Sequence, residues 1–131
     1  MEKYFIYKIF DQMFATPINH IESIEKITKI TAIPLQSKEI LGMASIRNKL
    51  FTVINTAEIL SIQKQEENSE DQNYLVLLDN KIACEISEPS NIEEVNPNEF
   101  QQALETKIWV RQDKQAIPIY DLFELTKSYL K

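Results

Sequence analysis

Short apolar runs separated by turn residues occupy most of the chain. One run extends from Ile40 to Ile46 and contains Gly42, the only glycine in the protein. Arg47-Asn48 interrupts the pattern, and a second run extends from Lys49 to Ile54. Because Asn tolerates the positive φ that a two-residue turn requires, these residues predict a β-hairpin with Asn48 in its turn.

A short helix is expected directly after this hairpin. Asn55 and Glu58 have the spacing of a capping box, which predicts a helix over 56–60. The same spacing returns 66 positions later at Asp121 and Glu124, again after an apolar run. The second occurrence predicts another capped helix near the end of the sequence.

A second similarity within the chain has an offset of 68 positions. It relates 10–16 to 78–84, each a turn dipeptide between apolar residues. Two similarities at nearly equal offsets indicate an internal repeat. We therefore expect two halves, at approximately 13–66 and 67–131, each built from hairpins and a closing helix.

The remaining pattern predicts more strands and a few connections. Strands are expected over 4–10, 13–16, 27–33, 74–78, 81–86, 107–111 and 115–119, and a closing helix over 122–130. A solvated linker is expected over 63–73, a loop with an extended piece at 92–95 over 88–98, and a helical turn over 100–104. Short strands at regular spacing with few helices favour small β-barrels.

The residues after Pro17 suggest a different local structure. Proline fits the first turn of a helix, and Ile18, Ile21 and Ile24 recur every third residue. This spacing predicts a short amphipathic helix or turn.

Charge and composition exclude several classes of function. The 131 residues carry a formal net charge of -6, with 14 Lys and Arg against 20 Asp and Glu and no basic run. Nucleic-acid binding relies on clusters of Lys and Arg that neutralise phosphates, so we expect no nucleic-acid partner. No 18-residue apolar segment is present, which predicts no direct membrane insertion. The first residues lead straight into a strand, and the single cysteine fits a reducing compartment, so we expect a cytoplasmic protein.

The sequence offers little for catalysis. With one glycine it has neither a phosphate-binding loop nor a dinucleotide fingerprint, and no His/Cys cluster has metal-ligand spacing. His20 and Cys84 are the only residues of their types, and a nucleophilic pair is geometrically possible. A surface histidine and a buried strand cysteine explain them more simply. We therefore expect no enzyme activity and no cofactor, and Arg47 at the hairpin tip is the residue whose setting invites a functional interpretation.

The order of these motifs resembles the CheW family of chemotaxis coupling proteins. The family pattern has a proline, a glycine eight positions later, a turn beginning with arginine, and then an apolar strand exit. Here these are Pro34, Gly42, Arg47-Asn48 and 52–56. A family element before the proline resembles 21–24, and a second strand exit resembles 118–122. The similarity covers nearly the whole chain.

The resemblance implies a mainly β fold and an adaptor function. It implies a single CheW-like domain over 1–131, with two five-stranded SH3-like barrels packed side by side and short helices. The N-terminal strand is either part of one barrel or shared between both. In that family the protein is a non-catalytic adaptor that couples the cytoplasmic hairpin of a chemoreceptor to the regulatory domain of a CheA-type histidine kinase.

The resemblance also indicates partner-binding residues. Gly42 and Arg47 carry over from the central hairpin, with Asn48 and Ile46 beside them, and Ile21 carries over at the side of an apolar groove between the barrels. A receptor helix would present apolar anchors to such a groove, with polar groups at the rim that set its register. Gly42 would allow a backbone to come close, and Arg47 would bond a carboxylate or carbonyl of the helix.

Four residues depart from the family pattern. Asn48 stands at the family's glycine, Thr52 at its proline, Asn55 at its aspartate and Ser23 at its glutamate. These departures leave open a diverged CheW-like scaffold for another chemosensory output, such as pilus motility or the capping of arrays. A small β-barrel enzyme that uses His20 or Cys84 is the alternative from another class.

Overall fold

A computed structural model of the chain describes residues 1–33, 37–63, 71–104 and 106–129. Three sequence-based expectations lie wholly or partly outside these residues. They are Pro34 of the family pattern, most of the linker predicted over 63–73, and the end of the helix predicted over 122–130.

The described residues form short strands with a few helical turns. The strands are β1 (Glu2–Ile9), β2 (Gln12–Pro17), β3 (Ile21–Lys26), β4 (Ile40–Ile46), β5 (Lys49–Ile54), β6 (Tyr74–Leu78), β7 (Ile82–Ile86), β8 (Glu88–Val95), β9 (Gln101–Ala103), β10 (Thr106–Val110) and β11 (Ala116–Ile119). The helices are α1 (Thr56–Ile59) and α2 (Leu122–Thr126), with 3-10 turns η1 (Pro97–Glu99) and η2 (Lys127–Tyr129).

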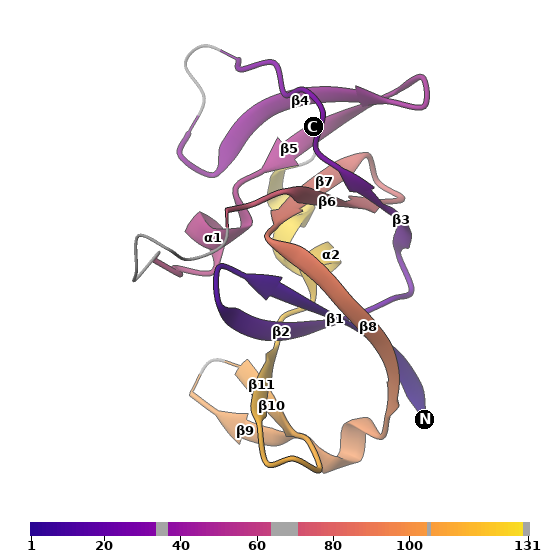
Figure 1. The fold of residues 1–131 in the computed structure, drawn as a ribbon, viewed down its shortest axis with the longest axis vertical. Helices are drawn as coiled ribbons and strands as arrows, with labels where there is room; N and C mark the ends of the chain where they lie inside the picture. The colour runs from indigo at the N-terminus through magenta and orange to yellow at the C-terminus, as the bar shows by residue number, and fades with distance from the viewer. Residues whose placement is uncertain (34–36, 64–70, 105, 130–131) are drawn as a thin grey trace.

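The strands form two sheets that lie one above the other in Figure 1. The five-stranded sheet has the order β3-β6-β7-β5-β4, and the six-stranded sheet has the order β8-β1-β2-β11-β10-β9. The mainly β fold with short helices is therefore confirmed. The second sheet has six strands rather than the predicted five, because residues 101–103, expected as a helical turn, pair with β10 as β9.

The two sequence similarities correspond to one repeated arrangement of strands. In one sheet β5 runs parallel to β7 with Val53 opposite Ala83, and in the other β11 runs parallel to β2 with Ile119 opposite Ala15. Val53 and Ile119 are related by the offset of 66, and Ala15 and Ala83 by the offset of 68. Each sheet thus combines strands from before and after residue 66, so sheet membership does not follow the expected division of the chain into 13–66 and 67–131.

The helix caps formed as the spacing predicts. The side chain of Asn55 accepts a hydrogen bond from the Glu58 N–H at 3.3 Å, and that of Asp121 accepts one from the Glu124 N–H at 3.2 Å. Each cap satisfies an N–H at the start of a helix that has no partner inside the helix. The two helices therefore begin in the same way at equivalent places, after β5 and after β11.

The short helix predicted after Pro17 is wrong. Pro17 belongs to β2, opposite Tyr4, and residues 21–26 form the edge strand β3. Ile21 and Ile24 pair with Leu78 and Val76 of β6, and the register shifts between Ile21 and Ser23. This β-bulge places Ile21 and Ile24 against the same core although they are three residues apart. The three-residue spacing thus reflects a bulged strand, not a helix.

Two further local predictions differ from the structure. Residues 88–91, expected to be loop, join the extended piece predicted over 92–95 in the strand β8, which pairs with β1 along almost its whole length. Pro89 is tolerated there because β8 is an edge strand, where one side of the backbone needs no ladder partner. Residues 27–33, expected to be a strand, contribute an isolated bridge from Thr31 to Met43.

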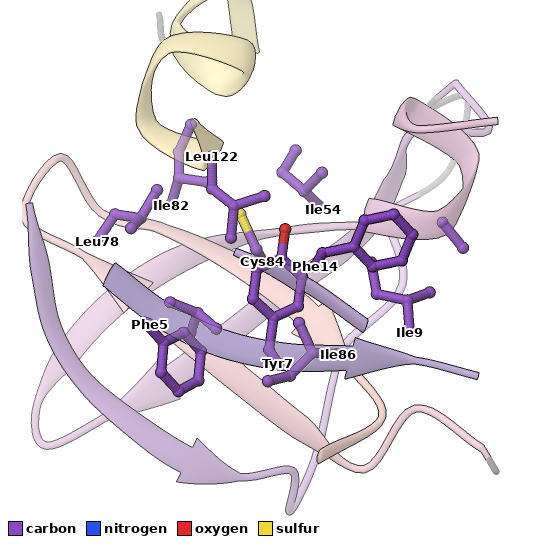
Figure 2. Close-up of a cluster of buried hydrophobic side chains, with 12 residues drawn as sticks. Phe5, Tyr7, Ile9, Phe14, Ile54, Leu78, Ile82, Cys84, Ile86 and Leu122 are labelled. Carbon is purple, nitrogen blue, oxygen red and sulfur yellow. The ribbon is translucent and has the colours of Figure 1, made fainter. Parts of the chain in front are cut away.

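Alternate residues of the central strands face different cores. Tyr4 and Ile6 of β1 pack inside the six-stranded sheet, whereas Phe5 and Tyr7 face the other sheet. The same alternation in β6 sends Leu75 into the five-stranded sheet. Between the sheets a shared core collects buried side chains from both, and Figure 2 shows ten of them by name. They include Phe5, Tyr7, Ile9, Phe14, Ile54, Leu78, Ile82, Cys84, Ile86 and Leu122.

Candidate functional site: a groove between two edge strands

An apolar pocket opens at one side of the shared core. It has a volume of about 520 Å³ and lies between β3 of one sheet and β1 and β8 of the other. Its lining consists of Phe5, Ile18, Ile21, Glu22, Ser23, Ile24, Ser90, Asn91 and Ile92. We call this pocket the inter-sheet groove. The middle of the contact between the sheets is filled by side chains, so the groove is its open margin.

The two edge strands that flank the groove are equivalent in the repeat. β3 has its bulge at Glu22 and β8 has its register shift at Ser90, and these residues are related by the offset of 68. The same offset relates Ile24 to Ile92, so each strand contributes an equivalent isoleucine to the groove. Bulges re-aim the side chains beside them and often lie next to functional sites. Here they turn both strands toward one apolar space.

The groove has the composition of a binding surface for an apolar partner. Ile92 remains 58% exposed, although it is a large aliphatic side chain on a strand. Ser23, Asn91 and Glu22 add polar groups around the isoleucines. An apolar centre with a polar rim is the usual arrangement of a protein-protein contact.

The tip of the β4–β5 hairpin reaches the outer side of β3. The Arg47 Nη2 lies 3.0 Å from the Glu25 Oε2, and the Lys49 Nζ lies 3.4 Å from the Glu22 Oε2. The Arg47 side chain stays 71% exposed. Through β3 the structure thus brings the predicted Arg47 and Ile21 to one region, with Ile21 in the groove and Arg47 on the flanking ion pair.

Asn48 lies in the hairpin turn, whereas Ile46 packs against a core. Arg47 and Asn48 have φ values of 53° and 66°, the left-handed turn that the hairpin prediction required. Ile46 is partly buried and packs against the core of the five-stranded sheet. Neither Asn48 nor Ile46 lines the groove.

Gly42 is needed by the chain itself. It has a φ of 151°, and a Cβ atom there would lie 2.1 Å from the Thr31 carbonyl oxygen. Thr31 and Met43 exchange two backbone hydrogen bonds of 2.8 Å beside it. The backbone that approaches Gly42 therefore belongs to this chain, at a bulge of β4 opposite β5.

Sequence reasoning missed most of the groove. Phe5 and Ile92 come from strands far from β3 in the sequence, and residues 88–98 were expected to be mainly loop. One signal was available: the offset of 68 relates Ile24 to Ile92. Lys49 and Glu22, which form the second ion pair, had no sequence signal because their proximity depends on the curvature of the sheet.

The two residues considered for catalysis lie in different surroundings, one in the core and one at the surface. Cys84 is fully buried in the shared core, and burial raises the pKa of its thiol to about 12, so the nucleophilic thiolate is strongly disfavoured. The Nδ1 of His20 lies 3.0 Å from the Asp79 Oδ2 at the surface. Within the described ranges, no group of three or more His, Cys, Asp or Glu residues is arranged to hold a metal ion. No helix among the same residues is long and apolar enough to cross a membrane.

Comparisons with known proteins agree with this fold. The family model of the CheW-like domain matches residues 3–128, so the chain belongs to the CheW-like domain family. The crystal structure of the scaffolding protein TtCheW from Thermoanaerobacter tengcongensis is similar, with a TM-score of 0.80 and 16% sequence identity. That match covers 96% of this chain and 92% of the other. A search of curated proteins found no match.

The four departures from the family pattern have different structural consequences. Asn48 has a positive φ of 66°, a conformation that glycine also adopts readily, and Asn55 caps α1 as an aspartate would. Thr52 lies within β5, where its hydroxyl points to the Met43 Sδ at 3.6 Å. Ser23 is the one departure that lines the groove. The first three preserve the fold, whereas Ser23 changes the chemistry of the candidate binding surface.

Proposed function

We propose that this chain is a non-catalytic cytoplasmic adaptor that couples the cytoplasmic helical hairpin of a chemoreceptor to the regulatory domain of a CheA-type histidine kinase. Membership of the CheW-like family supports the coupling role. The observation that carries the receptor part is the inter-sheet groove, an open apolar surface between two equivalent edge strands.

The groove suits one face of an amphipathic helix. Such a helix presents apolar side chains at positions i, i+3 and i+4, and a groove lined by isoleucines removes them from water. Full burial of one aliphatic side chain contributes roughly 1.5 to 3 kcal/mol. Ile21 and Ile24 on one wall and Ile92 on the other supply the complementary apolar surface.

Arg47 supplies a polar contact at the edge of this region. A guanidinium has five N–H donors, and the ion pair with Glu25 leaves donors for a second acceptor. A carboxylate or a terminal carbonyl of the bound helix would be such an acceptor. In this arrangement Arg47 fixes the register of the helix and the groove supplies most of the affinity.

Co-fractionation of purified components tests both contacts. The full chain is mixed with a receptor hairpin fragment and with the regulatory domain of a CheA-type kinase, both from the organism that encodes it. We expect a complex with each and a ternary complex with both. Ile92→Ser should remove the receptor fragment and leave the kinase domain bound. The assignment would be contradicted if Ile92→Ser still bound both partners. It would also be contradicted if the unaltered chain bound neither of them.

A diverged scaffold for another chemosensory output is the second candidate, and Ser23 favours it. This serine stands in the groove where the family has a glutamate, so the set of helices that fit is altered. Restoring the acid with Ser23→Glu distinguishes the two functions. If the unaltered chain binds no chemotaxis receptor fragment but the variant does, the groove is specialised for a different partner.

A further inference from the structure

His20 joins three parts of the molecule that are distant in sequence. It lies in the connection between β2 and β3, and its Nδ1 is 3.0 Å from the Asp79 Oδ2 in the β6–β7 turn. Its ring stacks on Phe123 of α2 with 3.7 Å between the ring centroids and an interplanar angle of 14°. The Asp79 backbone N–H also donates to the His20 carbonyl oxygen at 2.9 Å. The side chain and the backbone of His20 are therefore both held.

The residues beside His20 contribute to the lining of the groove. Ile18 and Ile21 flank His20 in sequence, and both line the groove. The turn between them is closed by a hydrogen bond from the Ile21 N–H to the Ile18 carbonyl oxygen at 3.0 Å. A short turn moves as a unit, so whatever fixes His20 also fixes the positions of Ile18 and Ile21.

Charged groups lie on both of the elements that contact the ring. On the β6–β7 turn Asp79 contacts the ring, and Lys81 lies in the same turn. At α2 and η2, the Lys127 Nζ lies 2.9 Å from the Glu124 Oε1 and 5.1 Å from the centre of the Phe123 ring. Asp79 is thus the charged group in direct contact with the ring, and the His20 side chain remains 46% exposed.

We propose that His20 is a positioning residue for the groove, because its contacts with Asp79 and Phe123 fix the turn that presents Ile18 and Ile21 to the partner helix. The groove therefore binds its helix more tightly when both contacts of the ring are in place. This inference rests on the proposed function for its partner, but the coupling of His20 to the groove is a property of the free protein.

Isoleucine methyl NMR of the full chain tests the coupling without any partner. At constant pH, Asp79→Ala should shift and broaden the Ile18 and Ile21 methyl resonances, because the side-chain partner of His20 is lost. Phe123→Ala, which removes the stacked ring, should have the same effect. Ile117, in the core of the six-stranded sheet, is the internal control, and Asp113→Ala, in another hairpin turn, is the matched variant. Ile18 and Ile21 resonances that stay in place in both variants, or that move equally in Asp113→Ala, would overturn the proposal.

A second measurement separates this inference from the proposed function. Affinity for a receptor hairpin fragment should fall by about two- to fivefold in Asp79→Ala, as expected for the loss of an exposed pair. Asp113→Ala should leave this affinity unchanged. If Asp79→Ala binds the fragment as tightly as the unaltered chain does, His20 does not position the groove. If the methyl groups respond but no fragment binds, the receptor assignment fails and the coupling stands.

Discussion

Arg47 and Glu25 form an ion pair of 3.0 Å between the tip of the β4–β5 hairpin and the edge strand β3. β3 and β4 are the two outer strands of the five-stranded sheet, so the contact shows that the sheet curls until its margins meet. A similar pair, Arg111 with Glu93 at 3.3 Å, joins the end of β10 to β8 in the other sheet. Glu25 and Glu93 are related by the offset of 68. Both sheets are thus closed by an arginine and an equivalent glutamate.

Reversing the charge of Arg47 should affect binding far more than stability. Exposed ion pairs contribute about 0 to 1 kcal/mol, so Arg47→Glu should change the free energy of unfolding by less than about 1 kcal/mol. The same change would place two acids together beside the groove and remove the donor proposed for the partner helix. We expect at least tenfold weaker binding of a receptor hairpin fragment in isothermal titration calorimetry.

The matched control for this experiment is Lys114→Glu. Lys114 is exposed in the turn of the equivalent β10–β11 hairpin, and its φ of 66° equals that of Asn48. It carries the same change of charge on the other sheet and should leave receptor binding unaltered. Equal losses in both variants would indicate a general effect of net charge.

Replacing Gly42 should destabilise the fold. The methyl group of Gly42→Ala would meet the Thr31 carbonyl oxygen, and the φ of 151° is one that residues with a side chain rarely adopt. Strain of this kind costs about 1 to 3 kcal/mol. Urea unfolding should show that loss, whereas Ser45→Ala, at an exposed position of the same strand, should not. A Gly42→Ala variant as stable as the unaltered chain would show that the Thr31 segment does not pack as described.

Ile24 and Ile92, the two equivalent isoleucines of the groove, should both be needed for binding. Ile92→Ser removes an exposed side chain, so the free energy of unfolding should change by no more than about 0.5 kcal/mol. Affinity for a receptor hairpin fragment should fall by about tenfold or more, because burial of an isoleucine contributes roughly 1.5 to 3 kcal/mol. Leu104→Ser is the control, since Leu104 is 99% exposed and does not line the groove. Unchanged affinity in Ile92→Ser would place the binding surface elsewhere.

Glu85 should make stability depend on pH. Burial raises the pKa of its carboxyl from 4.5 to about 7, so the folded chain holds a proton that the unfolded chain has released. The raised pKa of Glu85 leaves the free energy of unfolding unchanged below about pH 4.5 and lowers it as the pH rises to about 7. Above that pH the contribution of Glu85 is constant. Because Glu85 is only partly buried, we expect a loss of order 1 kcal/mol. Glu85→Gln should remove that part of the pH dependence in urea unfolding measured from pH 4 to 8; an identical profile would show that Glu85 titrates normally.

Local features of the fold could be predicted from the sequence because they depend on neighbouring residues. The hairpin turn at Arg47-Asn48 and the N-caps at Asn55 and Asp121 are decided by a few residues each, and all formed as expected. The repeat was visible as well, since equivalent positions in two sheets require similar side chains. Family membership followed from the order of these local motifs.

Features that depend on distant strands could not be predicted in the same way. The three-residue spacing of Ile21 and Ile24 is also the spacing of a helix, and only the pairing with β6 shows that a bulge produces it. The groove requires Phe5 and Ile92 to meet β3, which depends on how the two sheets pack. Gly42 was expected to admit a partner's backbone, but Thr31 of this chain occupies that space.

The most direct test of the central claim is a titration of the isoleucine-labelled chain with a receptor hairpin fragment at constant pH. Binding of a helix in the inter-sheet groove predicts that the methyl resonances of Ile18, Ile21, Ile24 and Ile92 shift together, while that of Ile117, in the core of the six-stranded sheet, stays in place. Shifts confined to isoleucines outside the groove, or no shifts at saturating fragment, would contradict it.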